Sequence, residues 1–404
     1  MKKIVIFLVS FFILSINTLA LEINSTNAIV YNLNDDTVIY EKNSEEVISI
    51  ASLTKIMTTI VAIEQIKDLD EKITIKSRDF VTLYEEGASM AGFKVGQTVS
   101  YRDLLYGTFL PSGAEATQAL AFNLAGSIEN FVALMNKKAE EIGLTNTHFA
   151  NTTGLDNKEN YSTVTDVAKL LKYALKNETF REIYEAISYT TSDNSMTLYS
   201  SFRYTAKRYG YNVNYIIGAK TGYTDDAGKC LASTAHDKKN DIYYMSVTCG
   251  ANTSTSDAYH IKDNVIIYNY FFDNYKYHTL IDKDELLVSI KTKYGKNKYA
   301  SFYAKEPILK FYDNSFDKDK VSFKYEGLKE ITPKTKINEK IGKIDIFYEN
   351  NLISTTDIIL DNEYNFSIFN YLVKTKLLYV LIIFIVIISI IRKKNSRKRA
   401  LHRH

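Results

Sequence analysis

The sequence predicts an α/β domain with an antiparallel sheet flanked by helices, followed by a small all-β domain and a C-terminal transmembrane helix. Its 404 residues are enough for two domains and appendages. Strand-like segments occupy both ends of the first 275 residues, and the stretch between them is mainly helical. Because strands from both sequence ends surround a helical middle, we expect the first and last strands to pair in one antiparallel sheet, as part of a layered α/β domain.

The predicted strands begin with a hairpin, because residues 27–31 and 38–40 alternate around the polar turn 34–36. Strand character resumes over residues 216–221 and continues through a second hairpin, 228–235 with 242–250. A helix is predicted directly after Ser52, since apolar residues return there at helical spacing. Helical patterns also cover most of residues 104–187 and a final run over about 257–275.

The first domain is thus predicted to span residues 21–275. Beyond Tyr275 the chain changes to short β-rich pieces separated by polar turns, namely residues 286–290, 321–325, 344–348 and 356–360. This pattern predicts a small β-sandwich over residues 276–365.

The N-terminus has the composition of a secretory signal. Lys2 and Lys3 precede an apolar stretch over residues 4–16, and small or neutral residues at Thr18 and Ala20 follow. We predict a signal peptide over residues 1–20 with cleavage after Ala20. A buried N-terminal helix is the alternative.

A second apolar run, over residues 377–391, is flanked by Lys374 and Lys376 before it and by Arg392 after it. We predict a membrane span over residues 372–391; the alternative is an interfacial helix, but the run has no polar face. The tail, residues 392–404, holds seven Lys or Arg and no acidic residue. The positive-inside rule places this tail in the cytoplasm. The chain would be a single-pass protein of the cytoplasmic membrane, with its large domain on the cell-wall side.

The formal net charge of +3 comes from the two ends. Without the tail, Lys2 and Lys3, the rest of the chain is net negative. We therefore expect no nucleic-acid partner. The sequence also contains no metal-ligand cluster and no phosphate loop, so no metal and no cofactor are predicted.

Cys230 and Cys249 are the only cysteines, and they fall on the two strands of the second predicted hairpin. A register that pairs Ala235 with Tyr244 would place the cysteines opposite each other. A disulfide is permitted outside the cell, and two core-facing thiols are the equal alternative.

The most informative motif is Ser52-Leu53-Thr54-Lys55, because residues three apart on a helix share one face. Ser52 would lie in the first turn, where unpaired N–H groups and the helix dipole favour a negative charge. Lys55 could take the hydroxyl proton of Ser52 if burial and a nearby like charge lower its pKa. By itself the motif is also consistent with a capping serine and a solvated lysine.

Two later motifs, Ser112-Gly113-Ala114 and Lys220-Thr221-Gly222, follow in the order found in penicillin-recognising serine enzymes. Segments 86–90, 143–149, 154–156 and 161–163 resemble the catalytic domain of low-molecular-mass penicillin-binding proteins, which are D-alanyl-D-alanine carboxypeptidases. The resemblance covers about residues 25–275, and residues 337–360 weakly resemble their all-β C-terminal domain. It implies a fold like that of β-lactamases and transpeptidases.

The resemblance also implies roles for the motif residues. Ser52 would form the acyl-enzyme, Lys55 would be the general base, and Ser112 would relay a proton between the two lysines. Lys220 and Thr221 would bind the terminal carboxylate of the substrate. Gly222, which has no side chain, would let the substrate backbone lie against the strand. The N–H of Tyr223 would form the oxyanion hole together with the N–H of Ser52.

The chain departs from the family pattern at Ala114, where the commonest residue is Asn. This change removes one or two hydrogen bonds to substrate, each worth about 1 kcal/mol. Glu115 could contribute polarity there. His148 is expected to be structural.

The expected function is serine-type D-Ala-D-Ala carboxypeptidase activity on peptidoglycan stem pentapeptides, inhibited by penicillins and other β-lactams. One alternative is a catalytically weak or silent penicillin-binding or wall-binding protein. The other is a β-lactamase, whose deacylating glutamate would come from the interval that contains Glu178, Glu182 and Glu185.

Overall fold

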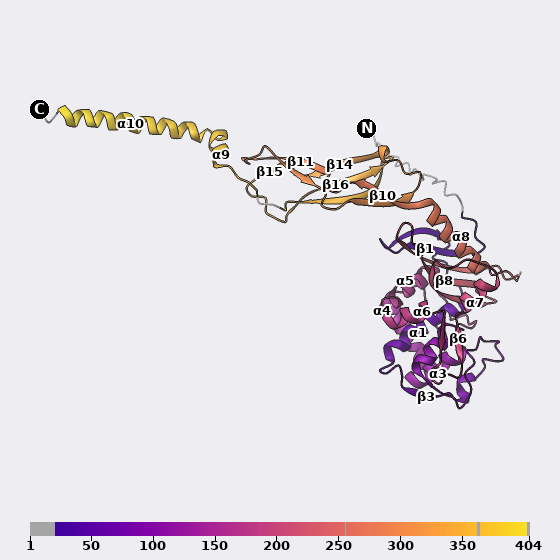
Figure 1. The fold of residues 1–404 in the computed structure, drawn as a ribbon. Helices are drawn as coiled ribbons and strands as arrows, with labels where there is room; N and C mark the ends of the chain where they lie inside the picture. The colour runs from indigo at the N-terminus through magenta and orange to yellow at the C-terminus, as the bar shows by residue number, and fades with distance from the viewer. Residues whose placement is uncertain (1–20, 255, 362–363, 402–404) are drawn as a thin grey trace, which may run out of the picture. The chain divides into compact units, whose positions relative to one another are not determined.

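The computed structural model describes residues 21–254, 256–361 and 364–401, which form two compact units that divide between Asp273 and Asn274. The predicted signal peptide, residues 1–20, lies outside the described residues. Figure 1 shows the mixed α/β ribbon of the first unit and the strand-rich ribbon of the second.

The first unit is built on a five-stranded antiparallel sheet with the order β2-β1-β9-β8-β7. The strands are β1 Asn27–Asn32, β2 Thr37–Lys42, β7 Ile216–Thr224, β8 Gly228–Asp237 and β9 Ile242–Ala251. Val30 of β1 pairs with Ser246 of β9, so the first and last strands join as predicted. This connection makes β7 an edge strand of the sheet.

The prediction that the middle of the chain is helical is confirmed. The apolar spacing had located these helices only approximately, and the structure gives their bounds. The helices of the first unit are α1 Thr54–Gln65, α2 Tyr101–Phe109, α3 Ala114–Ala125, α4 Ile128–Ile142, α5 Val164–Ala174, α6 Glu178–Glu185, α7 Ser201–Arg208 and α8 Tyr259–Asn274. Two short hairpins, not predicted, lie among them: β3 Lys72–Thr74 with β4 Thr98–Ser100, and β5 Ser188–Thr190 with β6 Thr197–Tyr199.

One local difference concerns Ser52, which was expected in the first turn of an α-helix. It lies instead in a short 3-10 turn, Ala51–Leu53, that directly precedes α1. The reason is Ala51, whose φ of +47° cannot continue an α-helix backward. Because the turn still leads into α1, Ser52 and Lys55 remain one turn apart.

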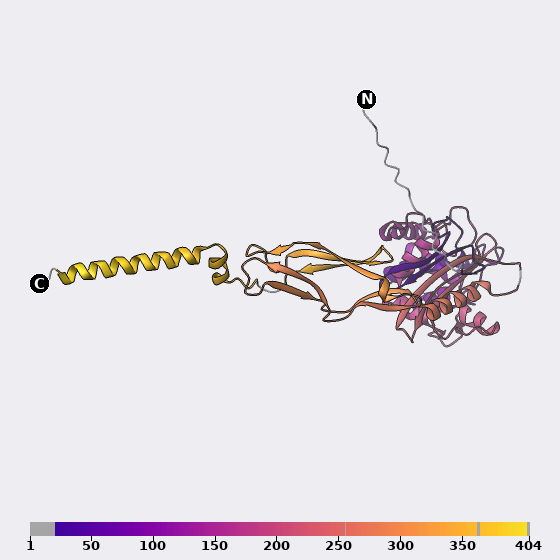
Figure 2. The same ribbon diagram turned by 90° about the horizontal axis from the view of Figure 1, so that it is seen from above.

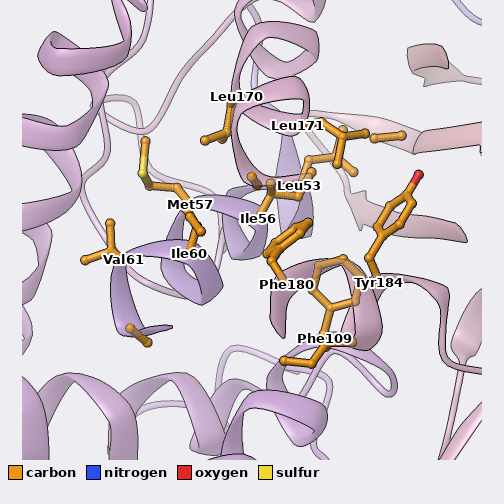
Figure 3. Packing of buried hydrophobic residues seen from close by; sticks show 14 of the residues in the cluster. Leu53, Ile56, Met57, Ile60, Val61, Phe109, Leu170, Leu171, Phe180 and Tyr184 are labelled. Carbon is orange, nitrogen blue, oxygen red and sulfur yellow. The ribbon is translucent and has the colours of Figure 1, made fainter. Parts of the chain in front are cut away.

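Helix α1 runs through the centre of the main core. Its apolar side chains pack with Leu170 and Leu171 of α5 and with the aromatic rings of Phe109, Phe180 and Tyr184, and all of these are at most 2 % exposed (Figure 3). Phe109 meets both other rings edge on, at 5.5 and 5.9 Å. Burial of each such side chain contributes roughly 1.5–3 kcal/mol, so α1 is firmly held.

Helix α8 packs against β8 and β9 with polar as well as apolar contacts. Asn264 donates to Thr248 Oγ1 at 2.9 Å and accepts from Ser233 Oγ at 2.8 Å, and the Tyr268 hydroxyl donates to the Ser233 carbonyl. All four side chains are buried. These bonds satisfy the polar groups that the sheet directs toward α8.

The two cysteines are free and buried. The predicted pairing of Ala235 with Tyr244 is present, but the register shifts between Lys229 and Leu231, next to Cys230. Both thiols belong to the main hydrophobic core, and a hydrogen bond to Cys230 together with burial raises the pKa of Cys249. Of the two alternatives, the structure contains the pair of core thiols.

The second unit is β-rich, as predicted. Its strands are β10 Tyr275–Ile281, β11 Leu286–Thr292, β12 Tyr299–Tyr303, β13 Ile308–Asp313, β14 Val321–Gly327, β15 Glu330–Ile331, β16 Lys340–Tyr348 and β17 Asn351–Ile359. They form three small sheets, β10-β13, β12-β11-β15 and β14-β16-β17, and share a core that includes Leu280, Ile331 and Ile346. Figure 2 shows these strands, coloured orange, running alongside one another.

The predicted helix over residues 372–391 is not continuous. Helix α9 spans Ile368–Lys374, and α10 spans Leu377–Leu401, with Lys376 between them at a φ of +60°. Among the described residues, no single helix has the length and apolar composition of a membrane span; the pair α9 and 377–397, bent by 86°, meets that criterion together. The positive φ at Lys376 explains the break, because a lysine in that region ends a helix.

Gly154 supports the turn that carries Ser52, and this contact can be tested. Its φ is +79°, and a Cβ there would lie 2.0 Å from the Ala51 carbonyl oxygen. We predict that Gly154→Ala lowers the thermal unfolding midpoint of the first unit by at least twice as much as Gly126→Ala, measured by calorimetry. Gly126 has a φ of +81° with open space around it, so its substitution costs only backbone strain, about 1–2 kcal/mol or about 2–8 °C. Equal shifts for the two variants would show that the contact with Ala51 is unimportant.

Candidate active site

The three sequence motifs meet at one cavity of the first unit, about 290 Å³ in volume. The 3-10 turn and α1 supply Ser52 and Lys55, the loop before α3 supplies Ser112, and the edge strand β7 supplies Thr221, Gly222 and Tyr223. All six line the cavity. Segments that lie far apart in the sequence thus converge on one site.

Ser52 and Lys55 form the central pair. Lys55 Nζ donates to Ser52 Oγ at 3.0 Å and to the Thr153 carbonyl oxygen at 2.5 Å. The Lys55 side chain is buried, because α1 lies in the core. Two acceptors therefore fix the amine beside the hydroxyl from which it could take a proton.

The environment of Lys55 favours the neutral amine. Burial lowers the pKa of Lys55 from its ordinary value to about 7, and the negative charge of Glu115 opposes this change. A lysine with a pKa near neutrality can act as a general base at physiological pH. The sequence suggested two causes for a lowered pKa of Lys55, burial and a nearby like charge, and burial is the one that acts.

Ser112 and Lys220 form a second pair. Lys220 Nζ donates to Ser112 Oγ and to the Thr221 carbonyl oxygen, each at 3.0 Å. Ser112 has a φ of +66°, an unusual backbone region for a serine, and strain of this kind costs about 1–3 kcal/mol. The strained turn directs the hydroxyl toward the lysine on β7.

The effect of a like charge falls on Lys220 and not on Lys55, where the sequence suggested it. Burial, and then the positive charge of Lys55, hold the pKa of Lys220 well below its ordinary value. Both amines therefore have a lowered pKa, and the charge of Lys55 contributes to the lowering at Lys220.

Strand β7 lies directly against the turn that carries Ser52. A Cβ on Gly222 would come within 3.2 Å of Ser52 N and of Ala51 Cβ, so a larger residue would push the two elements apart. Next to it, the Thr221 hydroxyl shares a 2.8 Å hydrogen bond with Ser201 Oγ of α7. Tyr223 is exposed, and its hydroxyl donates to Asp225 at 2.8 Å.

Comparison with known proteins now decides the family. The peptidase S11 family, described as D-alanyl-D-alanine carboxypeptidase, matches residues 15–253, more than half of the chain. This chain belongs to the S11 family. It is a serine-type D-Ala-D-Ala carboxypeptidase of the low-molecular-mass penicillin-binding type, and residues 275–365 match the C-terminal domain of penicillin-binding protein 5.

Similar proteins share both the sequence and the fold of this carboxypeptidase. D-alanyl-D-alanine carboxypeptidase DacF of Bacillus subtilis is 33% identical over 70% of this chain and 71% of its own length. The K15 DD-transpeptidase of Streptomyces is 31% identical, covers 62% of this chain and 98% of its own, and has a TM-score of 0.55. Penicillin-binding protein 5 of Haemophilus influenzae, 23% identical with a TM-score of 0.64, covers 85% of this chain and 98% of its own and shows the same fold.

Ala114, the departure from the family pattern, is the first residue of α3 and lines the cavity. The neighbouring Glu115 does not substitute for the missing amide. Its buried carboxylate accepts from the backbone N–H groups of Ala91, Gly92 and Phe93 at 2.8–3.2 Å, so it braces that loop. Glu115 reaches the chemistry only through its charge on Lys55.

Sequence reasoning did not assign Thr153, Ser201 or Asn151. Asn151 Oδ1 accepts from the N–H groups of Thr153 and Gly154, and this turn presents the Thr153 carbonyl to Lys55. The segment 154–156 was noticed as family-like, which was the available signal. The backbone carbonyl of Thr153 and the isolated Ser201 belong to no sequence motif that would have assigned them to the site.

The carboxylates considered for a β-lactamase are elsewhere. Glu178, Glu182 and Glu185 are exposed on α6, and none of them lines the cavity. His148 lies away from the cavity as well, with Nδ1 2.6 Å from the Glu159 carbonyl oxygen. Within the described ranges, no group of three or more His, Cys, Asp or Glu side chains could hold a metal.

The lowered pKa of Lys55 predicts how activity depends on pH. The amine is mostly protonated below pH 7 and mostly neutral above it, so kcat/KM for D-alanine release should rise about tenfold per pH unit up to about 7 and then level off. The measurement uses the full-length chain in detergent between pH 5 and 9.

Glu115→Gln provides a matched variant for this profile. The negative charge of Glu115 raises the pKa of Lys55, so its removal should move the inflection to lower pH. A value of kcat/KM that still rises about tenfold per pH unit between pH 8 and 9 in the unmodified enzyme would contradict the lowered pKa of Lys55.

Proposed function

We propose that the enzyme removes the terminal D-alanine of peptidoglycan stem pentapeptides through an acyl-enzyme on Ser52. The observation that carries this proposal is the 3.0 Å hydrogen bond between Ser52 Oγ and a buried lysine amine. Ser52 Oγ bonds to the carbonyl carbon of the penultimate D-alanine, the peptide C–N bond breaks, and the hydroxyl proton passes to Lys55. Water then hydrolyses the ester and regenerates Ser52.

The proton must reach the leaving amine for the first step to finish. We assign this transfer to Ser112, whose hydroxyl accepts from Lys220. Lys220 is not at the cavity surface, since it is 1% exposed and bonded to Ser112 and the Thr221 carbonyl. Its contribution to substrate binding would therefore be indirect: it holds Ser112 and Thr221 in place.

The other substrate contacts follow from the position of β7. The N–H groups of Ser52 and Tyr223 would hold the developing oxyanion, and losing one such donor typically costs about 3 kcal/mol of barrier. The Thr221 hydroxyl would bind the terminal carboxylate. The close approach of Gly222 to Ser52 N supports this arrangement, because it brings the backbone donors of β7 and of the Ser52 turn together.

Penicillins would acylate the same serine and inhibit the enzyme. A silent wall-binding protein is disfavoured by the paired arrangement of Ser52 with Lys55 and of Ser112 with Lys220. A β-lactamase is disfavoured because the three glutamates on α6 do not line the cavity.

Ser52→Ala should abolish both D-alanine release from a diacetyl-Lys-D-Ala-D-Ala peptide and covalent labelling by fluorescent penicillin. The reason is that no other hydroxyl is placed 3.0 Å from Lys55 Nζ among the described contacts. Ser49→Ala is the control; Ser49 bonds Asp156 and does not line the cavity, so this variant should retain activity. Full D-alanine release by Ser52→Ala would exclude Ser52 as the nucleophile.

We further propose that a signal peptide exports the chain and that the bent pair α9 and α10 anchors it, with the basic tail in the cytoplasm. The support is the apolar composition of 377–391 and the seven cations after it. Catalysis would then take place on the cell-wall side.

A chain that ends at Thr375 tests the anchor. It lacks α10, so we expect it in the soluble fraction after cell lysis, with D-alanine release retained, whereas the full-length chain sediments with membranes. A chain that ends at Arg397 keeps the apolar helix and should remain in the membrane fraction. Membrane association of the shorter chain would assign the anchor to another segment.

A further inference from the structure

The proposed mechanism needs a positive charge for the terminal carboxylate of the substrate, and Lys220 is badly placed to provide it. Lys220 is buried, its amine is bonded to Ser112 and Thr221, and it is absent from the residues that line the cavity. Burial and the nearby Lys55 also lower its pKa. The carboxylate must find its charge partner elsewhere on the cavity wall.

The cavity wall contains two lysines, Lys55 and Lys229, and no carboxylate among the described residues that line it. Lys55 is occupied with Ser52 and Thr153. Lys229 lies on β8 directly opposite Tyr223 of β7 in the strand register. Residues directly opposite each other, and residues two apart on one strand, share a face of the sheet. Lys229 is thus on the same face as Thr221 and Tyr223.

The position of Lys229 is held by the segment before α8. Its Nζ donates to the carbonyl oxygen of Asp257 at 2.6 Å, and its side chain is partly exposed. Unlike Lys220, which is 1% exposed, Lys229 reaches the cavity surface. The cavity wall therefore includes a lysine beside Tyr223 of β7.

A second residue of the cavity wall is His260, on the first turn of α8. It lines the cavity, is 9% exposed, and its Nδ1 is buried without a hydrogen-bond partner among the described residues. Burial, and then the charge of Lys229, lower the pKa of His260 to about 4, so the ring is neutral at physiological pH. An unpartnered buried polar atom is costly unless a ligand satisfies it.

We propose that Lys229 binds the terminal carboxylate of the substrate, in a subsite that also includes His260 and the hydroxyls of Thr221, Ser201 and Thr205. All five residues line the cavity. The subsite selects peptides with a free C-terminal carboxylate over peptides whose C-terminus is blocked or extended. This inference rests on the proposed acyl-enzyme route, since it assigns the leaving D-alanine to the part of the cavity wall that these residues form.

The test compares two substrates that differ only in this charge: diacetyl-Lys-D-Ala-D-Ala and the same peptide with a C-terminal amide. With the full-length enzyme in detergent, the acid should react at least ten times faster in kcat/KM than the amide. Lys229→Gln should slow the acid by about 10- to 100-fold, the usual effect of losing a charge-assisted hydrogen bond, and leave the amide within twofold. Lys229→Arg, which keeps the charge, should recover most of the activity on the acid.

One further variant, together with the comparison of the two peptides, separates recognition from a structural effect. Lys262→Gln removes a neighbouring exposed charge on α8 that does not line the cavity, and it should change neither substrate. A merely structural role for Lys229, through its bond to Asp257, would slow acid and amide equally. Equal slowing, or no change with either peptide, overturns the proposal. Failure of the Ser52 assignment is recognised independently, because Ser52→Ala would then keep its activity.

Discussion

Taking an ammonium group out of water costs several kcal/mol, and the first unit buries two of them, Lys55 and Lys220, at 2% and 1% exposure. The cost falls when the amines are neutral, and so burial produces the lowered pKa values on which the proposed mechanism depends. The apolar packing of the surrounding core offsets this cost. Helix α1, which carries Lys55, is covered by α5 and by the rings of Phe109, Phe180 and Tyr184. Stability and reactivity thus come from the same packing.

The site also depends on unusual backbone conformations. Ala51 and Ser112 both have positive φ values. Ala51 directly precedes Ser52, which is hydrogen-bonded to Lys55, and Ser112 is itself hydrogen-bonded to Lys220. Gly154 fits against Ala51, and Gly222 fits against the same turn from β7. Helices, a loop and the edge strand therefore constrain the position of Ser52 from three directions, which explains how the strain persists.

The sequence was sufficient for the parts of this structure that leave a periodic or ordered pattern. The closure of the sheet by β1 and β9 and the pairing of Ala235 with Tyr244 both follow from alternation and turn positions. The three motifs were predicted to meet, and they line one cavity. The order of the three motifs in the chain was informative because it is the order found in penicillin-recognising serine enzymes, whose motifs share one site.

Other features depend on tertiary contacts that no local pattern contains. The 3-10 turn at Ser52 follows from the φ of Ala51, and the break at Lys376 divides a run that composition alone presented as one helix. The function of Glu115 was unpredictable for the same reason. The backbone N–H groups that donate to its carboxylate belong to the loop 91–93, more than twenty residues earlier in the chain.

The place of β7 at the edge of the sheet has a consequence for the behaviour of the whole protein. An edge strand offers an open row of backbone donors and acceptors, which an extended peptide can join as an added strand. Most proteins protect such an edge against pairing with other chains, by covering it or by placing charges on it. In the proposed mechanism this edge must stay accessible, because Thr221, Gly222 and Tyr223 act from it. The enzyme therefore retains, as a requirement of its chemistry, the kind of surface through which β-proteins associate wrongly.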